Sequence, residues 1–88
     1  KKWWMDYKKR AIRARNLLRN EEFLGIMKDL REDQLRLIAN TSASEVEKRE
    51  DAHAIYRALN EIEFLLRADV DAEKLIERKA RDAHEHWT

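Results

Sequence analysis

The sequence predicts an all-α protein, a small helical bundle of three to four helices built on a central antiparallel helical hairpin. Two features of its composition support this prediction. The 88 residues contain no proline and a single glycine, Gly25. Charged residues make up 42% of the chain, and the strong helix formers Ala, Leu, Glu, Lys and Arg are abundant. A third feature is that apolar residues recur at helical spacing along most of the chain.

The chain length predicts one domain, residues 1–88. A folded domain of this size buries only about 60 to 65% of the surface of its unfolded chain. We therefore expect a stability that is small, or that a partner supplies in part. Because the chain starts at Lys1 and not at a methionine, we also expect that residues can precede it.

The first predicted helix spans residues 2–19. At 100° per residue its apolar side chains fall within about 80° of one another, and lysines and arginines cover the other side. The apolar side chains are Trp4, Tyr7, Ala11, Ala14 and Leu18, with Trp3 at their edge. Three interpretations of this helix compete. Its stripe packs on the central helix, or its basic face binds nucleic acid or an acidic protein surface, or it lies in a membrane interface.

The second predicted helix spans residues 21–39 and is the central one. Asn20 is suited to cap its first turn, and Glu21 and Glu22 place carboxylates at the positive end of the helix dipole. The apolar stripe of this helix is wide enough to contact two neighbours. It consists of Phe23, Ile26, Leu30 and Leu37, with Met27, Ile38, Leu24 and Leu35 beside them.

A polar loop over residues 40–44 precedes the third predicted helix, residues 45–67. Ser44 and Glu47 have the spacing of a capping box at its start. A loop this short predicts that the second and third helices form an antiparallel hairpin. The predicted core face of the third helix is Ala52, Ile55, Leu59, Ile62 and Leu66, flanked by Tyr56 and Leu65. Two ion pairs are expected on its opposite side, Glu45 with Arg49 and Glu63 with Arg67.

The stretch Asp69-Val70-Asp71 is predicted to end or kink the third helix, because Asp71 can cap a last helix over residues 72–86. The apolar stripe of that last helix is narrow. Its small alanines allow another helix to approach closely, and a tryptophan fixes its end. The stripe consists of Ile76, Ala80, Ala83 and Trp87.

Charge is unevenly distributed, although the net charge is only +1. Residues 1–20 contain eight Lys or Arg and one acid, Asp6, whereas residues 61–88 carry a net charge of −3. Such asymmetry is typical of a surface that binds an anionic partner, or of chains whose basic and acidic ends associate. The candidate contacts with nucleic acid or an acidic surface are Lys1, Lys2, Lys8, Lys9, Arg13, Arg15 and Arg19. The candidate hydrophobic contacts with a protein partner are Trp3, Trp4, Tyr7 and Trp87.

The sequence offers no constellation of residues for catalysis or for a cofactor. Zero cysteines exclude a disulfide framework, a thiolate zinc site and a cysteine nucleophile. His84 and His86 point about 160° apart on a helix and do not form a metal pair. Most acidic residues have a basic neighbour three or four positions away, which is typical of a solvated helix surface. We therefore expect a protein that is not an enzyme and has no cofactor, metal or small-molecule substrate.

Two stretches together contain a basic amphipathic start, a helix entry with Leu-Leu, Asn and then Phe, and a second helix rich in glutamate and arginine. They are ARNLLRNEEFLGIMKDL, Ala14–Leu30, and EKREDAHAIYRALNEIEFLL, Glu47–Leu66, and the match rests on Leu17, Leu18, Asn20, Phe23 and residues 49–59. In these features the chain resembles small helical proteins encoded among the head and packaging genes of tailed bacteriophages. The resemblance implies a structural or assembly role in the host cytoplasm or within a virion. The Trp3-Trp4 pair and the last helix depart from it.

The leading hypothesis is therefore a helical interaction or assembly module that docks on a larger assembly or self-associates. No apolar run approaches the roughly 20 residues that span a bilayer, so no membrane span is expected. One alternative is a nucleic-acid-binding protein that uses the basic first helix without sequence preference. Another is a small inhibitor or regulator that covers a basic groove of its partner with the acidic C-terminal half.

Overall fold

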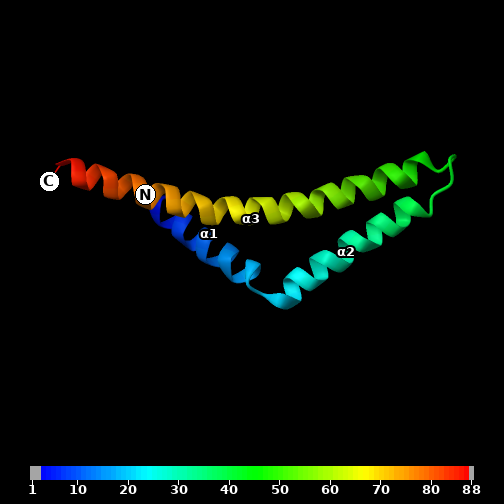
Figure 1. Cartoon of the computed structure of the whole chain (residues 1–88), viewed down its shortest axis with the longest axis horizontal. Coiled ribbons are helices and arrows are strands. Elements are labelled where there is room, and N and C mark those ends of the chain that lie inside the picture. Colours follow the sequence, from blue (N-terminus) through cyan, green and yellow to red (C-terminus); the bar gives the residue numbers. More distant parts are fainter. Residues whose placement is uncertain (1–2, 88) are drawn as a thin grey trace.

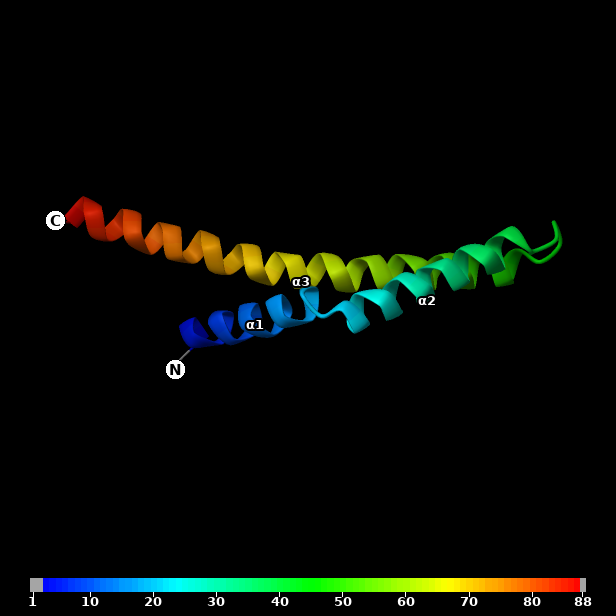
Figure 2. The ribbon, with the colours of Figure 1, turned by 60° about the horizontal axis from the view of Figure 1, so that its bottom comes forward.

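The computed structural model describes the backbone of residues 3–87 and the side chains of residues 6–85. The described chain is helical and has no strands, which confirms the all-α prediction. Helix α1 spans Trp3–Leu18, α2 spans Glu21–Ala39 and α3 spans Val46–Trp87. α3 runs the length of the molecule, while α1 and α2 follow one another along it in the opposite direction (Figures 1 and 2).

The central element is α3, so the prediction that the helix over residues 21–39 is central is wrong. α1 and α2 both pack mainly on α3, and they meet each other at their junction (Figure 1). α1 therefore docks on α3 and not on α2. The reason lies at Asn20, whose backbone is extended, with φ −84° and ψ 112°. One extended residue bends the chain between α1 and α2 without reversing it.

The predicted interruption at Asp69-Val70-Asp71 is also wrong, because these residues lie inside α3. The segment contains neither proline nor glycine, and contacts with α1 support its helical conformation. Asp69 pairs with Arg10 of α1, with 3.2 Å between Oδ1 and Nη2. Val70 and Ala72 are half-buried. Tertiary contacts here outweigh the preference of aspartate for a helix start.

Each helix has a series of residues of low exposure that are spaced alternately by three and four positions, as in a coiled coil. This spacing places them on one stripe of each helix, and we call the three stripes together the seam. On α1 they are Tyr7, Ala11, Ala14 and Leu18. On α2 they are Leu24, Met27, Arg31, Gln34 and Ile38. On α3 they are Arg49, Ala52, Tyr56, Leu59, Glu63, Leu66, Val70, Glu73 and Glu77.

The seam buries little apolar surface. The buried side chains of the described residues are Ala11, Ala14, Met27, Ala52 and Leu59. Three of the five are alanines, which let helices approach closely but remove little area from water. Charged side chains occupy several of the other seam positions. Arg31 and Glu63, for example, form an ion pair across it, with 3.1 Å between Nη1 and Oε1.

The predicted core face of the third helix is therefore only partly right. Ala52 and Leu59 are buried and Leu66 is half-buried, as predicted. Ile55 and Ile62 are 48% and 46% exposed, and so lie outside the seam. The helix is rotated so that its small alanine, and not its bulky isoleucines, faces α2. This rotation allows the two backbones to approach each other.

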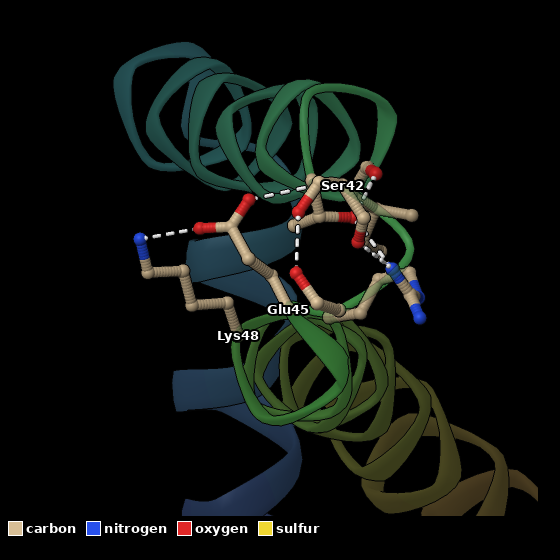
Figure 3. Close-up of polar contacts among 7 residues, drawn as sticks. Ser42, Glu45 and Lys48 are labelled. Carbon is tan, nitrogen blue, oxygen red and sulfur yellow. Dashed lines mark hydrogen bonds and ion pairs between the residues drawn. The ribbon is translucent and has the colours of Figure 1, made fainter.

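Local hydrogen bonds determine where α2 and α3 begin. Asn20 caps α2 as predicted, its Oδ1 accepting from the backbone N–H of Phe23 at 2.8 Å. The predicted capping box of Ser44 and Glu47 is displaced by two residues. Instead, the backbone N–H of Ser42 donates to Oε1 of Glu45 at 2.9 Å (Figure 3). The cause is that α3 begins at Val46, so Glu45 is the carboxylate nearest to the turn.

Side chains at the start of α3 tie the turn together. Lys48 Nζ lies 2.8 Å from Oε2 of Glu45 (Figure 3). Arg49 donates to Thr41 Oγ1 at 3.1 Å and to the backbone oxygen of Ser42 at 2.8 Å. The predicted pair of Glu45 with Arg49 is thus replaced by these contacts. The predicted pair of Glu63 with Arg67 is confirmed at 2.8 Å.

We predict that Glu45, in the turn between α2 and α3, makes the free energy of unfolding depend on pH. The donors Lys48 and Ser42 lower the pKa of Glu45 from 4.5 to about 2. A carboxyl whose pKa is lowered by folding stabilises the protein above its unfolded pKa, and this contribution is lost as pH falls toward the folded value. Between pH 4.5 and about 2, the free energy of unfolding of Glu45→Gln should fall less steeply than that of the wild type. Urea denaturation at several pH values measures both slopes. Parallel slopes, or the same change in a Glu47→Gln control, would contradict the prediction.

We also predict that one seam residue limits stability. The side-chain oxygen of Gln34 is buried and accepts no hydrogen bond from a described residue. Such an acceptor costs about 1 to 3 kcal/mol. Gln34→Leu should therefore raise the free energy of unfolding by about 1 kcal/mol, or Tm by about 4 to 8 °C, in thermal denaturation. Glu32→Leu, at an exposed position of the same helix, is the control for helix propensity. An equal shift in both variants would show that the buried oxygen is not the cause.

Candidate interaction surfaces

The basic side of α1 is largely paired within the chain. α1 packs along the stretch of α3 that is richest in acids, because residues 61–77 contain six acids and two bases. Three ion pairs join the two helices: Lys8 with Glu77 (3.6 Å from Nζ to Oε2), Arg10 with Asp69, and Arg15 with Glu73. Glu73 is the least exposed of these side chains, at 13%. The uneven charge along the sequence is thus partly neutralised by folding.

A smaller set of cations remains available on α1. Lys9 and Arg13 are exposed on the side of α1 away from Ala11 and Ala14, and Arg19 is exposed at the junction. None of these three cations forms an ion pair with another residue that the structure describes. Of the predicted contacts with nucleic acid, these are the ones that stay exposed and unpaired in the described part of the chain.

One of the predicted hydrophobic contacts can be located. Tyr7 is half-buried and belongs to the α1 stripe that faces α3. It serves the fold and does not form an open docking surface. The other predicted contacts lie outside the described residues, or have side chains that do: Lys1, Lys2, Trp3, Trp4 and Trp87.

The structure exposes apolar side chains that the sequence analysis assigned to the core. They come from the middle of the molecule, where α2 lies along α3. Each is between 40% and 59% exposed. We call these six side chains the apolar face: Ile26, Leu30 and Leu37 of α2, and Ile55, Ile62 and Leu65 of α3.

Both halves of the apolar face lie on the same side of the paired helices. On each helix, the side chains of the apolar face point about 100° away from the seam, as calculated at 100° per residue. Relative to the direction of its own chain, the rotation has the same sense on both helices. Because α2 and α3 run in opposite directions, these rotations lead to the same side. Leu37 and Ile55 also line one groove, together with Gln34 and Ala52. The six side chains therefore form one surface.

The opposite side of the helix pair is different. Phe64 is 65% exposed there, and it lines a groove with the charged side chains of Arg31, Glu63 and Arg67. Leu35 is 48% exposed on the same side of α2. Phe64 also lines a second groove with Ala68, Ala72 and Leu75, next to the charged Arg67 and Asp71. Leu35 lies among charged neighbours, which is normal for a solvated surface. Among the described residues, the apolar face is the surface that groups several large aliphatic side chains of both α2 and α3.

A signal for the apolar face was present in the sequence. Along residues 45–67, apolar residues fill two neighbouring stripes of three-and-four spacing, one through Ala52 and Leu59 and the other through Ile55 and Ile62. One neighbouring helix covers only one such stripe. The surplus stripe therefore indicates a second contact surface.

The described residues contain no group of three or more His, Cys, Asp or Glu side chains placed to hold a metal ion. None of the helices in this part of the chain is long and apolar enough to cross a membrane. Neither a protein-family model, nor a curated protein, nor a solved structure matches the chain.

We predict that the ion pair between Arg15 and Glu73 holds α1 on α3. Arg15→Glu places two carboxylates together. The loss of the ion pair should speed amide hydrogen exchange in α1 at least tenfold, which corresponds to about 1.4 kcal/mol, while the exchange rates in α2 should change less. The double variant Arg15→Glu with Glu73→Arg should restore slow exchange. Arg13→Glu makes the same charge change on the exposed side of α1 and should have little effect. Equal exchange rates in the Arg15 and Arg13 variants would refute this role.

Proposed function

We propose that the chain is a non-enzymatic helical module that binds protein, and that the apolar face on the α2–α3 hairpin is its working surface. One observation carries this proposal. Six large aliphatic side chains are about half exposed on one side of the molecule. Grouped apolar surface of this kind marks a protein interaction site in a chain that has no membrane-spanning helix among its described residues.

The shape of the chain supports the proposal. Its radius of gyration is 19.1 Å and its extents are 67 × 25 × 23 Å. A globular chain of 88 residues has a radius of gyration of about 12 Å. The helices are thus arranged as a rod with long open sides and not around one central core. A rod of this kind is suited to lie along another helical surface.

Within this proposal the role is structural, as a part of a larger assembly. This is the role implied by the resemblance of residues 14–30 and 47–66 to head and packaging proteins of tailed bacteriophages. The host cytoplasm or the virion would then be its location.

Nucleic-acid binding is the second candidate function, supported by the exposed cations Lys9, Arg13 and Arg19. Binding through them would be independent of sequence and would weaken steeply with salt. The candidate is weaker because Lys8 and Arg15 are paired with α3. The hypothesis of an acidic inhibitor meets the same difficulty, since α1 already pairs with three acids of the C-terminal half.

A photoreactive side chain tests the proposed surface. Benzoylphenylalanine in place of Ile62 should form covalent protein adducts when the cells that make the chain are irradiated. The same group in place of Phe64, two residues away on the opposite side of α3, is the matched control and should give several-fold less adduct. Mass spectrometry of the adducts measures both yields and identifies the linked protein. Equal yields at the two positions would contradict the proposed surface.

A further inference from the structure

We infer that the partner of the apolar face is a second copy of this chain, related to the first by a two-fold axis in the plane of the face. This inference rests on the proposed function, because it names the partner for the same surface. It follows from the exposed area, from the charges beside the face and from the geometry of the paired helices.

The exposed area is what a stable dimer would cover. The accessible surface of the chain is 7426 Å². A monomeric globular protein of 10.6 kDa has about 5,500 Å², so the excess is roughly 2,000 Å². Compared with its unfolded chain, the protein buries only about half of its surface, less than the 60 to 65% expected for this size. A standard protein interface covers about 800 Å² on each partner, and obligate homodimers cover more.

Charges beside the face do not require a partner of opposite charge. Asp33 pairs with Arg36 on α2, and Glu45 pairs with Lys48 at the turn. These four charges are neutralised within the chain, whereas Asp51, which lines the groove of Leu37 and Ile55, forms no ion pair with a described residue. A complementary surface therefore has to be mainly apolar. A net charge of +1 causes little repulsion between two copies. The face of a second copy meets both conditions.

The geometry of the α2–α3 pair also suits self-association. A two-fold axis brings the same surface of both copies together, so that every contact occurs twice. Two antiparallel helix pairs that meet in this way form a four-helix bundle, with the six aliphatic side chains of each copy in its centre. Three of the five buried side chains in the seam of one copy are alanines, and ion pairs cross that seam. The larger apolar core would then lie between the copies.

The mass of the purified full chain in solution tests this inference. Sedimentation equilibrium from low micromolar to hundreds of micromolar should give a dimer mass, twice the 10.6 kDa of one chain. Ile62→Glu buries a charge twice per dimer and should weaken dimerisation at least a hundredfold. Phe64→Glu makes the same change two residues away on the opposite side and should weaken it less than threefold. A monomeric wild type, or equal effects of the two variants, would overturn the inference.

A second variant covers the case in which Ile62→Glu fails to fold, as measured by circular dichroism. Ile62→Ala keeps helix propensity and should weaken dimerisation at least tenfold. No weakening by Ile62→Ala would also overturn the inference. The photoreactive variant separates the two proposals. If the wild type is a monomer and Ile62 links to a different protein, the proposed function stands and the dimer is wrong. If the adduct at Ile62 has the mass of two chains, both stand.

Discussion

The arrangement of this protein depends on a single constraint, that two helices in series must pack along one long helix through a stripe spaced by three and four residues. On a straight α-helix such a stripe drifts by about 20° per heptad. Over the 42 residues of α3 it therefore winds around the helix. α1 and α2 follow different parts of it because the extended residue Asn20 lets their directions differ (Figure 1).

The two halves of the seam hold their helices in different ways. α2 is held by Met27 and Leu59, by a polar turn and by the pair of Arg31 with Glu63. α1 is held by two alanines and three ion pairs with α3. Because alanine buries little area, the attachment of α1 depends more on charge and is more sensitive to salt. Six bulky aliphatic residues of α2 and α3 remain on the outer surface as the apolar face, which is where we place the function.

Local rules explain what the sequence predicts well. The cap at Asn20 and the pair of Glu63 with Arg67 depend on residues three or four positions apart, and both are present. The rotation of α3 is not local. Ala52 and Ile55 each begin a stripe of three-and-four spacing. Hydrophobicity alone predicts that the stripe with the isoleucine faces α2. The choice depends on how closely α2 approaches. The continuity of α3 at Asp69 is likewise not local, because this segment packs on α1 and Asp69 pairs with Arg10, which lies 59 residues away in sequence. The apolar face was missed for the same reason, since it is the stripe that the correct rotation leaves uncovered.

The order of the helices also affects how the chain folds during synthesis. α1 and α2 are complete before any of α3 has been made, and α3 is the surface on which both pack. At about 5 to 20 residues per second, the 42 residues of α3 take roughly 2 to 8 s to synthesise. The first half of α3 provides the contacts for α2, and the second half provides those for α1 (Figure 2). The helix that is made first is therefore the last to find its place on α3.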